Sequence, residues 1–173
     1  LGRLFDADVH IIAKSGMGML KNYNDKVIPT HPNMPDLWNR TLCGSAEPAW
    51  PSSSWVPDLA IVNLGTNDFS TQPNPTAEQF HDGYLAFSKR LKSLFPGAKQ
   101  LFMSGPMWCC HVCKTCCETV HSVANEVGAA VVDMPCLDYS KPGLVGCAGH
   151  PSVAGHQKMV NDTAPAIRHL MGW

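Results

Sequence analysis

Short apolar runs alternate along the chain with segments of helical periodicity. A run that is continuously apolar and bounded by Pro, Gly or Asp is typical of a strand covered on both faces. We predict four such strands, at residues 8–13, 58–64, 99–104 and 129–133. Because strands alternate with helices, the pattern indicates an α/β protein with a parallel sheet in a three-layer α/β/α arrangement.

Three helices are predicted between and after these strands. Thr76 and Gln79 have the spacing of a capping box, which opens a helix that runs to about Phe95. A second helix is expected over residues 116–127. A third begins at Ser152, and we expect Pro165 to kink or restart it. The first helix carries its apolar residues three or four positions apart, at Phe80, Tyr84, Phe87, Leu91 and Leu94.

Composition places the chain among globular domains. With 173 residues, 45% of them apolar, it has the size of one domain over residues 1–173. The formal net charge is -1 and there is no basic run, so we expect no nucleic-acid partner. Apolar stretches are far shorter than a membrane span, so we expect no membrane partner. Residues 22–57 show little periodicity, and a loop of that length inside a compact domain is usually either functional or a wrong assignment of its secondary structure.

The eight cysteines indicate an oxidising compartment. Five of them fall within residues 109–117 as CC-x2-C-x2-CC, and we expect most of the eight to be paired in disulfides. Two readings remain beside this one: a zinc site, because C-x2-C is a ligand spacing, and free thiols. The sequons at Asn39 and Asn161 favour a secreted glycoprotein in the same way.

Candidate chemistry lies at the ends of the predicted strands, where open α/β sheets bind ligands. Gly16 follows the first strand, Asn67 follows the second, and His150 lies in the loop beyond the last one. Backbone N–H groups, an amide side chain and an imidazole can together form an oxyanion hole and a general base. Taken singly, Gly16 could make a turn, Asn67 could cap a turn, and His150 could simply begin a helix.

Three segments carry a resemblance to a known family. VNLGTNDFS (residues 62–70) resembles the Gly-x-Asn-Asp block of the SGNH (GDSL-like) hydrolases. HPSVAGHQKM (residues 150–159) resembles the block with the catalytic His, and HIIAKSGMGM (residues 10–19) the block with the oxyanion-hole Gly. The resemblance covers nearly the whole chain and is closest to carbohydrate esterase family 2, the acetyl xylan esterase-like enzymes. It implies a flavodoxin-like fold and a secreted carbohydrate O-acetyl esterase.

The resemblance also implies roles for individual residues. Gly16 and Asn67 would donate hydrogen bonds to the oxyanion, and His150 would activate a serine nucleophile. The family's Gly-Asp-Ser motif does not occur in this sequence. We therefore expect the family's first strand and its nucleophilic serine to lie in an upstream segment of the same protein. That upstream segment would be a partner of the segment described by this sequence. No metal or cofactor is implied.

The partner of His150 is a second departure from the family pattern. The family commonly has an Asp three residues before this His, whereas Cys147 stands there. The resemblance allows a Ser-His dyad in which a backbone carbonyl orients the His, and Asp138 could instead fold back to it. We predict that a Cys136–Cys147 disulfide closes this loop and holds His150.

Aromatic side chains near these loops suggest a sugar-binding surface. Trp55, Phe69 and Trp108 are candidates to stack on acetylated polysaccharide or oligosaccharide, with core packing as the alternative for each. A competing function is an inactive carbohydrate-binding or structural protein with the same fold. A lipase or thioesterase would need an extended apolar groove, which the polar loops do not favour.

Overall fold

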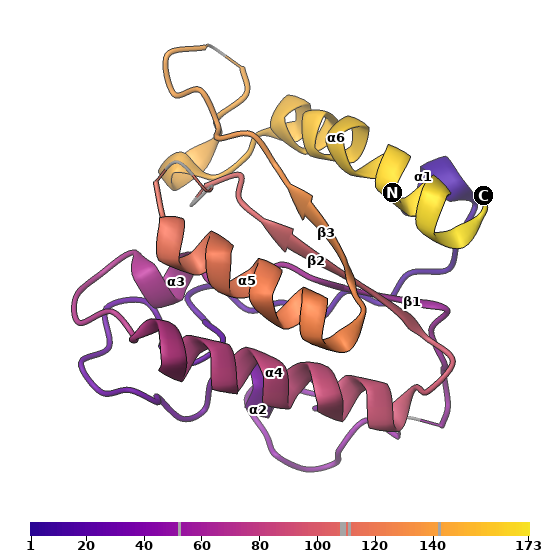
Figure 1. Ribbon diagram of the computed structural model, residues 1–173, viewed down its shortest axis with the longest axis horizontal. Coiled ribbons are helices and arrows are strands. Elements are labelled where there is room, and N and C mark those ends of the chain that lie inside the picture. The colour runs from indigo at the N-terminus through magenta and orange to yellow at the C-terminus, as the bar shows by residue number, and fades with distance from the viewer. Residues whose placement is uncertain (52, 108–109, 111, 142) are drawn as a thin grey trace.

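The computed structural model describes residues 1–51, 53–107, 110, 112–141 and 143–173. Its sheet has three parallel strands in the order β1-β2-β3 (Figure 1). Ile61 pairs with Leu101, and Met103 with Val132. The strands are β1 (Leu59–Val62), β2 (Lys99–Ser104) and β3 (Ala130–Asp133). Three of the four predicted strands are thereby confirmed.

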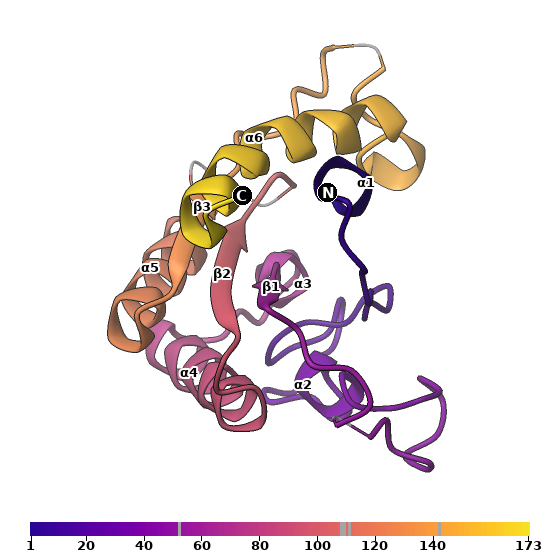
Figure 2. The ribbon, with the colours of Figure 1, turned by 90° about the vertical axis from the view of Figure 1, so that its right-hand side faces the viewer.

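Helices cover both faces of this sheet, which confirms the α/β class and the layers. Figure 2 shows α4 and α5 on one side and α6 on the other. Phe102 packs toward α4 and α5, whereas its neighbours Leu101 and Met103 pack toward α6, as alternate residues of a strand must. The helical elements are α1 (Gly2–Phe5), α2 (Met34–Leu37), α3 (Thr66–Phe69), α4 (Ala77–Leu94), α5 (Lys114–Val127), η1 (Cys147–Gly149) and α6 (Val153–Met171).

Local signals account for where the long helices begin. The Thr76 hydroxyl accepts a hydrogen bond from the Gln79 N–H, and the Gln79 side chain accepts one from the Thr76 N–H, so the capping box is confirmed. Ser152 Oγ accepts from the Gly155 N–H and opens α6. Helix α6 does not restart at Pro165: it continues from Val153 to Met171 with the exposed Pro165 inside it, and Ile167 packs against Leu101 and Met103 of the sheet. A kink at Pro165 stays a prediction.

The predicted strand at residues 8–13 is also wrong. This segment is irregular, and Ile11 is 84% exposed. A strand needs a ladder partner, and in the described chain β1 pairs only with β2. A cavity of about 620 Å³ separates residues 8–12 from β1, with Val9 and Ile12 on one side and Leu59 and Ile61 on the other. Of the apolar side chains on these walls, Val9, Ile12 and Ile61 are 50%, 50% and 39% exposed.

The expectation of an irregular loop over residues 22–57 holds for most of its length. Helix α2 and an isolated bridge between Arg40 and Ala49 are the regular elements in its described part. Among the described residues, no helix combines the length and the apolar character that crossing a membrane requires.

Candidate active site

The structure brings the Gly16 and Asn67 segments into direct contact. After β1, Gly65 turns the chain with a φ of 125° and caps α3, which carries Asn67. The Asn67 side-chain amide donates a 2.8 Å hydrogen bond to the carbonyl oxygen of Met17, the residue after Gly16. Figure 1 shows α3 and the first turn of α6 at the edge to which the arrowheads of β2 and β3 point. Helix α3, which carries Asn67, and the start of α6 thus lie at the carboxyl edge of the sheet.

Asp68 ties the two segments together more strongly than Asn67 does. Its fully buried carboxylate accepts three consecutive main-chain N–H groups, from Met19 at 2.9 Å, Leu20 at 2.6 Å and Lys21 at 2.9 Å. Burial raises the pKa of Asp68, and the three N–H donors oppose that rise. Spacing along the sequence does not indicate this role, although Asp68 stands beside Asn67 in the Gly-Thr-Asn-Asp motif.

A buried lysine strengthens the same junction. Lys21 is fully buried, and its ammonium group donates to Thr71 Oγ1 at 3.1 Å and to the carbonyl of Asn22 at 3.4 Å. Burial lowers the pKa of Lys21, and the nearby Asp68 carboxylate counteracts this. The loop and the residues around α3 are consequently joined by main-chain, amide and charged contacts.

Gly16 and Gly18 shape the loop in different ways. Gly16 has a φ of +79°, and its carbonyl accepts the Tyr23 N–H at 2.8 Å. Its own N–H donates no hydrogen bond to any described residue. A Cβ at Gly18 would lie 2.0 Å from the Lys21 carbonyl oxygen and 2.6 Å from Asp68 Oδ2, so only glycine fits there.

His150 lies in a separate, locally closed turn. It follows η1, its carbonyl accepts the Gly146 N–H at 2.7 Å, and an antiparallel bridge joins Val145 to Pro151. His150 is exposed, and its ring forms no hydrogen bond or ion pair with the part of the chain that the structure describes. Asp138 does not fold back to it, because its carboxylate accepts from Ser140 and pairs with Lys141.

The cysteines correct two expectations. Cys147 is a free, exposed thiol while Cys136 is disulfide-bonded, so the Cys136–Cys147 bridge was wrong. The turn around His150 is closed by the backbone contacts of Val145 and Gly146 instead. Most cysteines were expected to pair, and this was wrong too, since four described ones have free thiols: Cys43, Cys113, Cys116 and Cys147.

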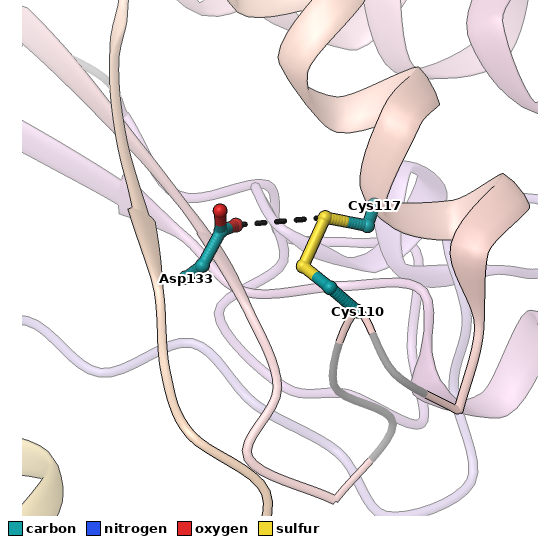
Figure 3. A group of neighbouring side chains, drawn as sticks. All are labelled: Cys110, Cys117 and Asp133. Atoms are coloured by element: carbon teal, nitrogen blue, oxygen red, sulfur yellow. Dashed lines mark hydrogen bonds between the residues drawn. A yellow bond between two sulfur atoms is a disulfide. The ribbon is translucent and has the colours of Figure 1, made fainter.

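Cys110 and Cys117 do form a disulfide, which the Cys-rich segment led us to expect. Figure 3 shows the Asp133 carboxylate directed at this bridge, with Oδ1 3.7 Å from Cys117 Sγ. The two sulfurs and the carboxylate are close enough together to hold a metal ion. Bonded to each other, however, the sulfurs cannot act as thiolate ligands, so this arrangement does not fit the zinc alternative. Cys109 lies outside the described residues.

The two aromatic candidates that the structure describes, Trp55 and Phe69, do not form one surface. Phe69 is only 7% exposed and packs edge-on against Phe80 at 4.9 Å, so its assignment to sugar binding was wrong: α3 turns it into the core. Trp55 precedes β1 at its amino end, away from the edge with Asn67, and stacks on His10 at 4.1 Å. Trp108 lies outside the described residues, so its role stays a prediction.

The two sequons occupy different surroundings. Asn161 is exposed on α6, where Oδ1 accepts from the Gln157 side chain at 3.2 Å. Asn39 is half-buried, and its carbonyl accepts the Trp50 N–H. Glycosylation at either position stays a prediction.

Comparison with known proteins gives concordant matches. A family model described as GDSL-like lipase/acylhydrolase matches residues 13–163. The chain is 30% identical over 176 residues to the cellulase/esterase CelE of Acetivibrio thermocellus, which covers 99% of this chain and 21% of that protein. It is also 30% identical over 183 residues to a Cellvibrio japonicus protein named acetylxylan esterase / glucomannan deacetylase, covering 92% of this chain and 45% of that protein.

A solved structure shares the fold. The family two carbohydrate esterase from Clostridium thermocellum in complex with cellohexaose has a TM-score of 0.89 and 29% identity, over 99% of this chain and 53% of that one. This chain therefore spans about half of that solved chain, and less than half of each curated relative.

Proposed function

This chain belongs to the GDSL-like lipase/acylhydrolase family, and we propose that it acts within a longer, secreted protein as a carbohydrate O-acetyl esterase. The observation that carries this proposal is the contact between Asn67 and the Gly16 loop, through the 2.8 Å bond from the Asn67 amide to Met17. In this proposal, the free hydrogen of the Asn67 amide and the Gly16 N–H, which has no partner in the described chain, are the two donors of the oxyanion hole. Two such donors suit the oxyanion that forms when an ester carbonyl is attacked.

In the proposed mechanism, a serine hydroxyl attacks the acetyl carbonyl and His150 takes its proton. The Gly16 N–H and the second hydrogen of the Asn67 amide hydrogen-bond the oxyanion. His150 then protonates the departing sugar oxygen, and water releases acetate in a second round. The exposed His150 ring, with no partner in the described chain, supports a Ser-His dyad rather than a triad through Asp138 or Cys147.

The serine is proposed to come from a strand upstream of Leu1. The cavity of about 620 Å³ beside β1 has apolar walls from Ile12 and Ile61, and it lies along the unpaired side of that strand. A strand inserted there would pair with β1 on one side and with residues 8–13 on the other. Because parallel strands end at the same edge, it would deliver its last residues close to Asn67.

The substrate class follows from the relatives. The Cellvibrio japonicus protein is named for deacetylating xylan and glucomannan, and the Clostridium thermocellum structure holds cellohexaose. We propose that this protein likewise acts on acetyl esters of a plant-type polysaccharide or its oligosaccharides. In this proposal the upstream segment is its partner within the same protein, and no nucleic acid or membrane is involved.

The test is His150→Ala in the full-length protein, with hydrolysis of acetylated xylan and 4-nitrophenyl acetate as readouts. Removing the general base should lower kcat by several orders of magnitude. His156→Ala is the matched control, because His156 is also exposed and lies on α6 six residues further on. Intact hydrolysis by a folded His150→Ala protein would overturn the esterase proposal. An inactive wild type that still bound cello-oligosaccharide would favour the binding-protein alternative.

A further inference from the structure

A pocket of about 330 Å³ lies between the end of α4 and the loop that follows α2. The two helices lie side by side (Figure 1, Figure 2). Because α4 ends just before β2 begins, the pocket is at the amino edge of the sheet, opposite the edge with α3. Its volume is at the small end of the range of about 300–1,000 Å³ for small-molecule sites. Apolar and polar side chains line it together: Trp38, Asn39, Trp50, Arg90, Ser93 and Leu94.

Asn39 brings a glycosylation acceptor to the wall of this pocket. It is the first residue of the sequon Asn39-Arg40-Thr41 and lies in the turn directly after α2. Its carbonyl accepts the Trp50 N–H at 2.6 Å, whereas its side-chain amide forms no hydrogen bond with any described residue. The backbone of Asn39 is therefore held in place while its amide nitrogen stays available for a covalent link, in a surface loop of the kind that carries glycans.

Trp50 supplies an aromatic surface in the same pocket. Trp50 is 40% exposed and Leu94 is 42% exposed, although both side chains are large and apolar. An edge-to-face contact with His10, at 5.4 Å between ring centroids, orients the Trp50 ring. Arg90 is also held, because it donates to the Pro35 carbonyl at 3.1 Å. An exposed ring beside fixed polar groups suits a sugar, which has apolar C–H groups on its face and hydroxyl groups on its rim.

We propose that Asn39 is N-glycosylated and that the first sugar of its glycan occupies this pocket, against Trp50. In the transfer, Asn39 Nδ2 bonds to the anomeric carbon of a lipid pyrophosphate-linked oligosaccharide. The bond from that carbon to the phosphate oxygen breaks, the lipid pyrophosphate leaves, and Nδ2 loses a proton. The inference rests on the secretion proposed above and is independent of the esterase reaction.

The second sequon of the chain provides an internal comparison. Asn161 is exposed on the regular helix α6, where its Oδ1 accepts from the Gln157 side chain at 3.2 Å. A glycan at Asn161 would extend into solvent and should change stability little. The first sugar at Asn39 should stabilise the fold, because it would remove apolar surface of Trp50 and Leu94 from water.

The test uses the full-length protein, secreted by a eukaryotic host and trimmed by an endoglycosidase to one N-acetylglucosamine per sequon. Mass spectrometry of peptides measures the occupancy of Asn39. Thr41→Ala removes this sequon while Asn39 stays in place, and Thr41 is exposed. We expect the wild type to unfold about 2–4 °C above Thr41→Ala. Asn161→Gln, the matched control, should stay within about 1 °C of the wild type.

Trp50→Ala shows whether the stabilisation depends on the aromatic ring. In that background the Thr41→Ala change should leave the unfolding temperature within about 1 °C, because the sugar then has no ring to cover. Leu94→Ser replaces Trp50→Ala if the latter is not secreted, and it should lower the shift due to Thr41→Ala in the same direction.

An unmodified Asn39 in the secreted protein would overturn the proposal, and so would equal unfolding temperatures of the wild type and Thr41→Ala. A Thr41→Ala shift of the same size with and without Trp50 would also overturn it. Hydrolysis of 4-nitrophenyl acetate is measured on the same samples and should be equal in the wild type and Thr41→Ala. A protein that is glycosylated and stabilised but inactive would therefore count against the esterase proposal alone.

Discussion

The Asn67 side-chain amide donates to the main-chain carbonyl of Met17 across 2.8 Å and 50 positions of sequence. This bond joins the turn after β1 to the glycine loop that precedes it in the chain. The amide has two hydrogens, and only one of them is used within the part of the chain that the structure describes. The bond therefore orients the side chain and leaves its second hydrogen for a ligand.

Replacement of Asn67 by Ala should remove an oxyanion donor. We expect kcat for acetylated xylan in the full-length protein to fall about 10²–10³-fold, with KM little changed. Steady-state kinetics measures both quantities. Asn74→Ala, in an exposed loop, is the control and should leave kcat within about twofold of the wild type. An unchanged kcat in Asn67→Ala would remove Asn67 from the proposed oxyanion hole.

Replacement of Asp68 by Asn should destabilise the protein strongly. An amide in this position would direct N–H groups at the N–H groups of Met19, Leu20 or Lys21, and the charge facing Lys21 would be lost. We expect the free energy of unfolding to drop by about 2–4 kcal/mol, measured by urea unfolding. Asp58→Asn, an exposed control, should change it by less than about 0.5 kcal/mol. Equal stabilities of the two variants would contradict the anchoring role of Asp68.

Replacement of Phe69 by Ala tests its place in the core. Loss of the buried ring against Phe80 should lower the free energy of unfolding by about 3–5 kcal/mol. Leu94→Ala provides a comparison, because Leu94 is 42% exposed and should matter much less. If Phe69→Ala were as stable as the wild type and had a raised KM for acetylated xylan, Phe69 would be a sugar-binding residue and not a core residue.

His81 should make stability depend on pH. Hydrogen bonds with Asp82 and Glu126 raise the pKa of His81 above its ordinary value of 6.5, and the one with Glu126 connects α4 to α5. The protonated ring then stabilises the folded state fully below pH 6.5, and this contribution is lost as pH rises through the raised pKa. Because the groups are partly exposed, we expect about 0.5 kcal/mol.

The measurement compares His81→Gln with the wild type by urea unfolding at pH 5.5 and pH 9. The variant should be less stable than the wild type at the lower pH and nearly equal to it at the higher one. His169→Gln, exposed and without an ion pair in the described chain, is the control for the loss of a surface histidine. If His81→Gln lost more unfolding free energy relative to the wild type at pH 9 than at pH 5.5, the proposed stabilisation by protonated His81 would be wrong.

Local signals predicted most of the secondary structure. Thr76, Gln79 and Ser152 mark helix starts through hydrogen bonds within four residues, so their effect can be read from neighbouring positions. The run at residues 8–13 has the same apolar character as the true strands, but a strand exists only if another strand pairs with it. Whether a pairing strand is present depends on other parts of the fold, and the residues of the run at 8–13 do not reveal it.

The candidate site was also predictable only where neighbouring positions in the sequence carry the signal. The Gly-Thr-Asn-Asp motif located Asn67, and the contact with Met17 joins it to the glycine loop that the sequence also singled out. The role of Asp68 depends on three N–H groups that lie 47–49 positions away, and spacing along the chain does not reveal them. Phe69 and Cys147 show the same limit, because the direction of one side chain and the pairing of the other depend on tertiary contacts.

The buried Lys21 and Asp68 have a consequence for how a substrate would be recognised. Their contacts connect the glycine loop to α3 and Thr71 before any ligand is present. Conformational entropy that a flexible loop would lose upon binding has therefore already been lost during folding. Association with substrate should need little ordering of this loop, and the amide protons of Met19, Leu20 and Lys21 should exchange slowly with solvent deuterium in the unliganded protein.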